Sequence, residues 1–256
     1  MTDLLVLRNV EKRFGGLRAL NAVSLTIPEG CVYGLIGPNG AGKTTLFNVI
    51  TGLYQAESGE RVFAGEALPL MLKPHRIVQR GIARTFQNIR LFQNMTALEN
   101  VMVARHGRTR TGVFGAITRH ARARAEESAI RERASALLDY VGIAASANKL
   151  AKELSYGDQR RLEIARALAT EPRLLALDEP AAGMNPTETA GLRSLITRIR
   201  DDGITVLLIE HDVKLIMGLC DRVAVLDFGE KIAEGTPAEV QSNSRVIEAY
   251  LGSGAA

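Results

Sequence analysis

Short apolar runs alternate with helix-like segments along most of the chain, and this pattern predicts an α/β fold. Residues 23–27 alternate between apolar and polar side chains before a Pro-Glu-Gly turn, which is typical of a strand with one buried face. Residues 31–36 are apolar throughout, and residues 173–177 and 205–209 are nearly so. Such runs are expected for strands that are buried on both faces of a sheet.

Capping residues and periodicity mark the helices. Residues 45–51 follow a glycine-rich loop and end at Gly52, so they predict a short helix. Thr96–Glu99 forms a capping box, and Asn185–Glu188 and Thr236–Glu239 cap two further helices. Apolar residues at helical spacing predict two buried helix faces, one with Ile130, Ala134, Leu137, Leu138 and Val141, the other with Leu192, Leu195, Ile196 and Ile199.

The order of these segments predicts the organisation of the chain. Residues 88–159 are mostly helical, whereas strands and helices alternate on either side of them, with a hairpin turn at residues 227–230. We therefore predict two α/β parts, residues 1–87 and 160–235, around a helical insert. Residues 236–256 form a helical tail in this interpretation.

Composition narrows the class of protein. The chain has 256 residues, of which 46% are hydrophobic and 23% charged, as in a globular protein with a sizeable core. Its longest apolar runs, such as residues 206–209, are far too short to span a membrane, and the first residues lack the layout of a signal peptide. Cys31 and Cys220 lie far apart in apolar contexts, which favours buried, reduced thiols. We expect a cytoplasmic protein that reaches a membrane only through partners.

The positive charge is concentrated in one segment. Residues 105–133 hold eight arginines and only three acids, while the whole chain has a formal net charge of +4. A basic stripe over the core and aromatic stacking residues would be expected for binding to nucleic acid, and the chain has no Trp. The segment is either a solvated arm, the simpler interpretation, or a contact with anionic lipid or an acidic partner.

One stretch predicts a phosphate-binding loop. Residues 37–44 match G-x-x-x-x-G-K-[ST] between a predicted strand and a predicted helix. Glycines in such a loop let backbone amides face the phosphates, and the helix N-terminus adds a favourable dipole. Lys43 would reach the β- and γ-phosphates, and the Thr44 hydroxyl would bind Mg²⁺. The residues expected to bind ATP here are Gly37, Pro38, Asn39, Gly40, Ala41, Gly42, Lys43, Thr44 and Thr45.

Two carboxylates end another apolar strand, residues 174–177. Asp178 would hold Mg²⁺, and Glu179 is placed to orient and deprotonate an attacking water. Alone, such a strand end is as often a solvated acidic turn, but the upstream phosphate loop favours the catalytic interpretation. No G-x-G-x-x-G opens the loop, which excludes a Rossmann dehydrogenase.

The segment Leu154–Gln159, which reads Leu-Ser-Tyr-Gly-Asp-Gln, resembles the LSGGQ signature of the ATP-binding subunits of ABC transporters. The resemblance covers essentially the whole chain. It implies a P-loop NTPase fold of the ABC-ATPase type, with a RecA-like core, an antiparallel β subdomain and an inserted α-helical subdomain. It also implies ATP hydrolysis coupled to transmembrane transport, with ATP and Mg²⁺ as cofactors.

The resemblance assigns further roles by motif order. Phe14 matches the aromatic residue that stacks on adenine, Gln87 the Q-loop glutamine, and His211 the switch histidine, while residues 182–185 occupy the D-loop. Taken singly, these residues have structural alternatives: a core phenylalanine, a turn residue and a helix N-terminal residue. The implied catalytic residues are Glu179, His211, Gln87 and Lys43, and the implied Mg²⁺ ligands are Thr44, Gln87 and Asp178.

Three positions depart from the family pattern. Tyr156 replaces the first glycine of the signature, Asp158 replaces its glutamine, and Asn185 replaces the usual D-loop aspartate. Asp158 is three residues after Ser155, where an acid is favoured at a helix start, so we interpret it as structural. Ser155 and Gly157 are retained, and in the family they contact the ATP of the opposite subunit. The resemblance therefore implies a head-to-tail dimer with ATP at the interface.

Within the family, residues 83–92, 162–169 and 179–186 and the Ala-Tyr-Leu-Gly ending resemble the longer ATPase subunit of bacterial branched-chain amino acid importers. Such a subunit pairs with a sibling ATPase, or with itself, and with two permease subunits on the cytoplasmic side of the inner membrane, and a periplasmic binding protein supplies the substrate. Urea or aromatic-acid import, lipopolysaccharide export, and a soluble ATPase without a membrane partner are the alternatives.

Overall fold

The computed structural model describes residues 2–105 and 121–252, and a six-stranded sheet forms its centre. The strand order is β10-β9-β3-β8-β7-β6, and all neighbours pair in parallel except β10 with β9. The strands are β3 (Val32–Ile36), β6 (Ile82–Arg84), β7 (Leu174–Asp178), β8 (Thr205–Ile209), β9 (Arg222–Asp227) and β10 (Glu230–Gly235). The carboxyl ends of the parallel strands therefore meet at one edge, where α/β sheets bind ligands.

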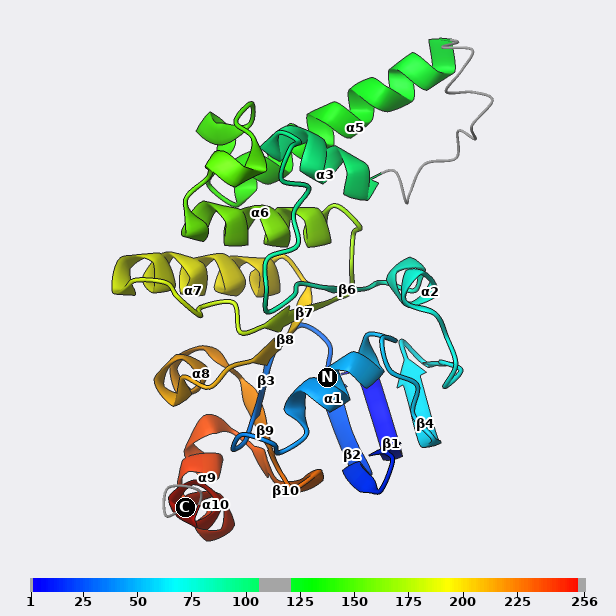
Figure 1. The fold of residues 1–256 in the computed structure, drawn as a ribbon, viewed down its shortest axis with the longest axis vertical. Coiled ribbons are helices and arrows are strands. Elements are labelled where there is room, and N and C mark those ends of the chain that lie inside the picture. Colours follow the sequence, from blue (N-terminus) through cyan, green and yellow to red (C-terminus); the bar gives the residue numbers. More distant parts are fainter. Residues whose placement is uncertain (1, 106–120, 253–256) are drawn as a thin grey trace.

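A second sheet is antiparallel and has the order β2-β1-β4-β5. Its strands are β1 (Asp3–Phe14), β2 (Leu17–Pro28), β4 (Ser58–Phe63) and β5 (Glu66–Ala67). Helix α1 (Lys43–Ile50) packs with both sheets in one apolar core (Figure 1). The phosphate loop, which joins β3 to α1, consequently starts between the two sheets.

Helices cover the opposite face of the six-stranded sheet. α7 (Pro186–Asp201) and α8 (Val213–Leu219) pack directly on it. Beyond α7 lies a helical layer of α3 (Ala97–Arg105), α5 (Ala121–Tyr140) and α6 (Tyr156–Leu168), as Figure 1 shows. The smaller helices are α2 (Pro74–Gln79), α9 (Pro237–Gln241) and α10 (Ser244–Gly252), with 3-10 turns at Ala144–Ser146 and Ala151–Glu153. Within the described ranges no helix is both long and apolar enough to cross a membrane.

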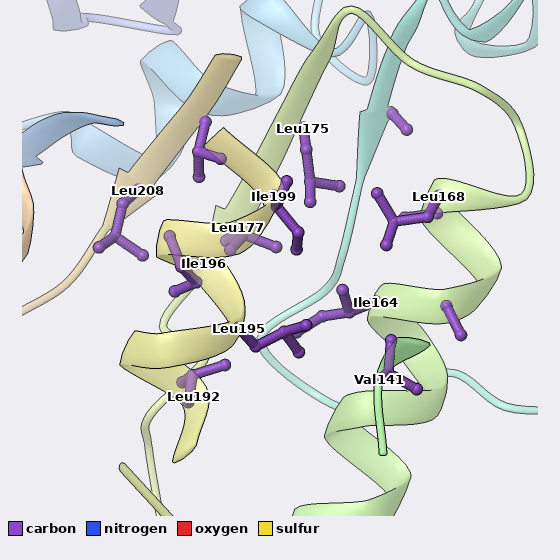
Figure 2. Close-up of a cluster of buried hydrophobic side chains, with 14 of the residues drawn as sticks. Val141, Ile164, Leu168, Leu175, Leu177, Leu192, Leu195, Ile196, Ile199 and Leu208 are labelled. Carbon is purple, nitrogen blue, oxygen red and sulfur yellow. The ribbon is translucent and has the colours of Figure 1, made fainter. Parts of the chain in front are cut away.

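Side-chain alternation on the buried strands divides the interior into two cores. On β7, Leu175 and Leu177 face α7, whereas Leu174 and Ala176 face α1. Figure 2 shows the first core, in which α7 is packed between the sheet and α6. Its labelled side chains are Val141, Ile164, Leu168, Leu175, Leu177, Leu192, Leu195, Ile196, Ile199 and Leu208. Each fully buried aliphatic side chain contributes about 1.5–3 kcal/mol.

The structure confirms the predicted strands, the hairpin at residues 227–230 and the two buried helix faces. It also confirms the three predicted caps, at Thr96, Asn185 and Thr236. Each of these side chains accepts a hydrogen bond from the backbone N–H of the glutamate three residues later, and that glutamate side chain accepts one from the backbone N–H of the cap residue. Cys31 and Cys220 are buried free thiols, as expected.

Two expectations need comment. The boundary predicted after residue 159 falls inside α6, because Ser155 already caps that helix; the four-part division of the chain stays a prediction. The arginine-rich segment at residues 105–133 lies partly outside the described residues, so its two alternative roles also stay predictions.

Replacing Ile196 by alanine tests the core between the sheet and α6. Ile196 is fully buried on α7, so Ile196→Ala should lower the free energy of unfolding by about 2–5 kcal/mol through lost burial and a residual cavity. Ser194→Ala, at an exposed position of the same helix, is the control and should change it by less than about 0.5 kcal/mol. Equal denaturation midpoints for the two variants would contradict this packing.

Candidate active site

The phosphate loop fits its place only because two of its residues lack a Cβ. Gly37 has a φ of 151°, and a Cβ there would lie 2.1 Å from the Leu226 carbonyl oxygen. Gly42 has a φ of 97°, and a Cβ there would lie 2.6 Å from the Ala19 carbonyl oxygen. The loop therefore passes between backbone of β9 and β2, and any larger residue at either position would displace it.

Helix α1 starts directly after this loop and suits an anion. Gly42 is its N-cap in the left-handed conformation, and the first turn contains no acidic residue. The first amides of a helix have no partner within the helix, and the helix dipole places partial positive charge there. The start of α1 therefore offers donors and positive potential to a phosphate group.

Lys43 is held at the mouth of the loop. Its Nζ donates to the carbonyl oxygens of Gly37, at 2.7 Å, and of Pro38, at 2.8 Å. Burial lowers the pKa of this ammonium group, and the negative charge of Glu179 opposes the shift. An incoming phosphate would offer Lys43 a charged partner in place of two neutral carbonyls.

An open cleft of about 520 Å³ brings most of the predicted nucleotide residues together. Phe14 lines it from the end of β1 and is 44% exposed, while its ring meets Tyr54 edge-on at a centroid distance of 5.2 Å. Phe14 is thus partly exposed at the rim, with Lys12 Nζ 5.1 Å from its ring centre, and the ring can meet a flat ligand group. The described residues that line the cleft are Phe14, Leu17, Arg18, Ala19, Asn39, Gly40, Ala41, Gly42, Lys43, Thr44, Thr45, Glu179, Phe228 and Gly229.

Glu179 lies at the centre of a polar cluster on this edge of the sheet. The Gln87 Nε2 donates to Glu179 Oε2 at 2.8 Å, and His211 Nδ1 lies 3.9 Å from the same oxygen. These residues follow β7, β6 and β8 respectively, so three neighbouring strands deliver them. A carboxylate held from two sides and open to the cleft can accept a proton from a bound water.

Asp178 occupies a different environment from its neighbour. Only 4% of the residue is exposed, and its Oδ2 lies 3.5 Å from the Arg84 guanidinium. Burial raises the pKa of Asp178, and the charge of Arg84 opposes this shift. Asp178 is thus a buried carboxylate at the back of the site, whereas Glu179 faces the cleft.

Arg84 is a site residue to which the sequence analysis assigned no role. It stacks between two rings, with its Cζ 4.6 Å from the Phe47 centroid and 4.4 Å from the Phe86 centroid. It also donates to Asn48 Oδ1 at 2.8 Å and to Thr51 Oγ1 at 3.0 Å. A charged residue at the carboxyl end of a short apolar strand was the available signal.

Glu210 is a second site residue for which the sequence predicted no role. It is 1% exposed after β8, its Oε1 accepts a hydrogen bond from the Ala181 amide at 2.9 Å, and its Oε2 lies 3.7 Å from His211 Nδ1. Burial raises the pKa of Glu210, and the Ala181 amide opposes the shift. A carboxylate after an apolar strand, the pattern that singled out Asp178, would have predicted it.

The signature residues do not join this cleft. Ser155 caps α6 by accepting a hydrogen bond from the Asp158 amide at 3.2 Å, and Gly157 lies against Glu188 of α7. None of the described cleft-lining residues comes from this segment. α6 and α1 belong to the cores on opposite faces of the six-stranded sheet (Figure 1).

The predicted Mg²⁺ ligands have a suitable chemistry. Thr44, Gln87 and Asp178 supply hydroxyl, amide and carboxylate oxygens, which are the donors that Mg²⁺ prefers. Among the described residues, no group of three His, Cys, Asp or Glu side chains is clustered tightly enough to hold a metal alone. Such a site suits an ion that takes its other ligands from phosphates and water.

Comparison with known proteins decides the family. The profile of the ABC transporter family matches residues 20–182, and that of the branched-chain amino acid ATP-binding cassette transporters matches residues 230–256. The chain is 47% identical to the high-affinity branched-chain amino acid transport ATP-binding protein LivG of Salmonella typhimurium, over 255 residues, 97% of this chain and 98% of that protein. The chain belongs to the ABC transporter family of ATP-binding proteins. Members of this family hydrolyse ATP to power transport.

Other matches rank the alternatives and support the fold. The lipopolysaccharide export ATP-binding protein LptB of Haemophilus influenzae is 35% identical over 250 residues, 98% of each chain. A crystal structure of an ABC transporter cassette in its ADP conformation matches with a TM-score of 0.85 and 32% identity, over 98% of this chain and 100% of that chain. A dimeric cassette bound to ADP and Pi matches with a TM-score of 0.77 and 28% identity, over 91% and 99%. The predicted ABC-ATPase fold and nucleotide binding are thereby confirmed.

Lys43→Ala tests the phosphate loop. Removing the ammonium group takes away the side chain expected to neutralise the β- and γ-phosphates, so ATP affinity should fall at least about 100-fold. Lys149→Ala, at an exposed position that does not line the cleft, is the control and should bind as the wild type does. Titration with a fluorescent ATP analogue measures both; an unchanged dissociation constant for Lys43→Ala would contradict the assignment.

Proposed function

We propose that this chain is the ATP-hydrolysing subunit of an importer for branched-chain amino acids. The observation that carries the proposal is its 47% identity, over nearly the whole length of both proteins, to an ATP-binding protein named for that transport. The match of residues 230–256 to the corresponding C-terminal profile supports the same branch of the family. The lower identity to the lipopolysaccharide export protein makes export the weaker alternative.

The geometry supports a role for each site residue. We infer that the amides of residues 37–45 and the Lys43 ammonium bind the phosphates, while the Phe14 ring stacks on adenine. Mg²⁺, when bound by Thr44, Asp178 and Gln87, would neutralise charge on the phosphate oxygens. Glu179 takes the proton of the attacking water.

Gln87 and His211 act through Glu179 in this proposal. Gln87 donates to Glu179 Oε2, so it fixes the direction of the carboxylate on one side. His211 Nδ1 lies 3.9 Å from the same oxygen and limits the movement of the carboxylate on the other side. Glu210, buried beside His211, holds the Ala181 amide and so supports the D-loop, residues 182–185, next to the site.

A second subunit completes the site. Ser155 and Gly157 line no part of the cleft of their own chain, and α6 packs on the opposite side of the sheet from α1. We propose that they contact the ATP held by a partner ATPase in a head-to-tail dimer. The partner is a sibling subunit, with a second copy of this chain as the alternative. A solved relative that is dimeric with ADP and Pi bound supports the pairing of two ATPase subunits.

Membrane partners complete the machine. We propose that two permease subunits hold the ATPase pair at the cytoplasmic side of the inner membrane, and that a periplasmic binding protein delivers the amino acid. A cavity of about 230 Å³ near the Q-loop glutamine is lined by apolar residues, among them Leu53, Val78 and Phe86, and by the charged residues Arg84, Arg90, Glu163 and Arg166. It offers a socket for a permease segment. Closure on ATP would move this socket and drive transport.

Glu179→Gln separates binding from hydrolysis. The amide keeps the shape of the side chain but accepts no proton, so kcat should fall by about 100-fold or more, with ATP affinity retained and the closed dimer accumulating. Glu60→Gln, an exposed position on β4, is the control and should hydrolyse ATP normally. Phosphate release and size-exclusion chromatography with ATP report the two effects. Turnover near the wild-type rate would remove Glu179 from the role of base.

The substrate is tested on the assembled complex. The native complex, reconstituted in liposomes with its binding protein, should hydrolyse ATP faster when that protein is loaded with leucine than when it is empty. Urea, phenylalanine and lipopolysaccharide are the comparison ligands, and only a branched-chain amino acid should stimulate and be carried inward. Stimulation by one of the others alone would replace the proposed substrate while leaving the ATPase assignment intact.

A further inference from the structure

Tyr156, one of the two residues that depart from the family signature, contacts the D-loop of its own chain. It begins α6 directly after the cap Ser155, and it is 43% exposed. A Cβ added to Gly183 would lie 3.2 Å from Tyr156 Cε1, and Gly183 has a φ of 77°. The tyrosine ring therefore lies against the D-loop backbone, at a position where only glycine combines that φ with so close an approach.

Arg160 joins Tyr156 to the Q-loop segment, residues 86–90. Its guanidinium donates to Tyr156 Oη at 3.0 Å, to the Phe86 carbonyl oxygen at 2.6 Å and to the Gln87 carbonyl oxygen. Its Cζ lies 5.4 Å from the centre of the Tyr156 ring. Because the residue is only 2% exposed, water does not compete for these hydrogen bonds, which are charge-assisted.

The other end of the Q-loop segment is held by the next turns of α6. Glu163 pairs with Arg160 at 3.2 Å and accepts a hydrogen bond from the Arg90 amide at 3.0 Å. Arg166 donates to the Arg90 carbonyl oxygen. Residues three apart lie on one helix face, so a single face of α6 holds both ends of the segment.

Gln87 extends these contacts to the hydrolysis site. Its backbone carbonyl is bound by Arg160, while its side chain donates to the Glu179 carboxylate. A continuous path of contacts thus runs from Glu179 through Gln87, Arg160 and Tyr156 to Gly183. The path connects a residue facing the chain's own ATP with the start of α6, which would face the ATP of the partner.

Packing alone does not account for this arrangement. Arg160 Nε is buried and has no hydrogen-bond partner, and an ion pair of 3% and 4% exposed side chains brings a large desolvation cost. Apolar residues of similar volume would often stabilise such a position at least as well. The guanidinium fixes the relative positions of these segments, because its planar fork binds two successive carbonyls and the tyrosine hydroxyl in one geometry.

We propose that Tyr156 and Arg160 are positioning residues that make the signature segment, the Q-loop segment and the D-loop of this chain move together. The state of the chain's own nucleotide site is thereby transmitted to the surface that completes the partner's site. The inference rests on the two-subunit ATPase proposed above, and it adds which side chains couple the two sites.

The test uses the native complex with Tyr156→Phe or Arg160→Lys in this chain. The phenylalanine keeps the ring on Gly183 and removes only the hydroxyl that Arg160 binds. The lysine keeps the charge and loses the fork that reaches two carbonyls. We expect kcat to fall about threefold to tenfold and the Hill coefficient for ATP to fall toward unity, more strongly for Arg160→Lys. ADP affinity of the full chain should not change, because its phosphate loop is intact.

Tyr140→Phe is the matched control. Tyr140 also pairs with an arginine between the helical layer and α7, with Arg198 Cζ 4.1 Å from its ring centre and its hydroxyl donating to Asp202 Oδ2 at 2.6 Å. This pair contacts neither the Q-loop segment nor the D-loop. Tyr140→Phe should lower the melting temperature as much as Tyr156→Phe does while keeping wild-type kcat and cooperativity.

The outcomes separate the proposals. Wild-type kcat and cooperativity in Tyr156→Phe, with a cooperative wild-type complex, would overturn the positioning role and leave the proposed function standing. Equal losses in Tyr156→Phe and Tyr140→Phe would also overturn it, because they would reflect stability alone. A wild-type complex that hydrolyses ATP without cooperativity would overturn the two-site function and this inference together. If Arg160→Lys does not fold, Tyr156→Phe decides.

Discussion

The close approach of backbone to backbone at the phosphate loop is the constraint on which the rest of the site depends. The loop runs where the antiparallel sheet meets the six-stranded sheet, with Gly37 against the Leu226 carbonyl and Gly42 against the Ala19 carbonyl. Those contacts fix α1 between the two sheets and set the direction of its first amides. A shift of either sheet would therefore move the phosphate-binding donors. Nucleotide binding thus depends on the same packing that holds α1 between the sheets.

Charged residues organise the back of the site at a cost in solvation. Burial raises the pKa of Asp178, Glu163 and Glu210, and in each case a specific donor or cation opposes the shift. The partners are Arg84 for Asp178, the Arg90 amide and then Arg160 for Glu163, and the Ala181 amide for Glu210. Because an unpaired buried charge is strongly destabilising, each pair fixes the distance between elements that are far apart in sequence. The loops around the cleft are thus held by hydrogen bonds as well as by apolar packing, to which Ile89, Ala181 and Met184 contribute.

Local signals predicted one part of this structure and missed another. Residues 31–36 and 205–209 were recognisable because both faces are buried, and the caps at Thr96, Asn185 and Thr236 were recognisable because three residues suffice to form them. β1 was not predicted, because register shifts interrupt its pairing with β2 and break the alternation of buried and exposed side chains. The link between Arg84 and Asp178 joins residues 94 positions apart, and that between Arg160 and Gln87 joins residues 73 apart. No short stretch of sequence contains both members of such a pair. The order of the motifs predicted a site residue only where the family pattern assigns a role to that position.

Strand register explains why the adjacent carboxylates of Asp178 and Glu179 lie in different environments. Asp178 pairs with Ile209 in the parallel ladder, and the Glu179 amide then donates to the Ile209 carbonyl at 2.9 Å, one step beyond the strand end. At Glu179 the backbone turns into the left-handed region, with a φ of 46°, which is unfavourable for a residue with a Cβ and persists only where surrounding contacts enforce it. That turn directs the second carboxylate into the cleft while the first stays behind the sheet edge. A slip of β7 by one residue would exchange their faces, so the pairing of β7 with β8 decides which carboxylate is buried beside Arg84 and which meets the water.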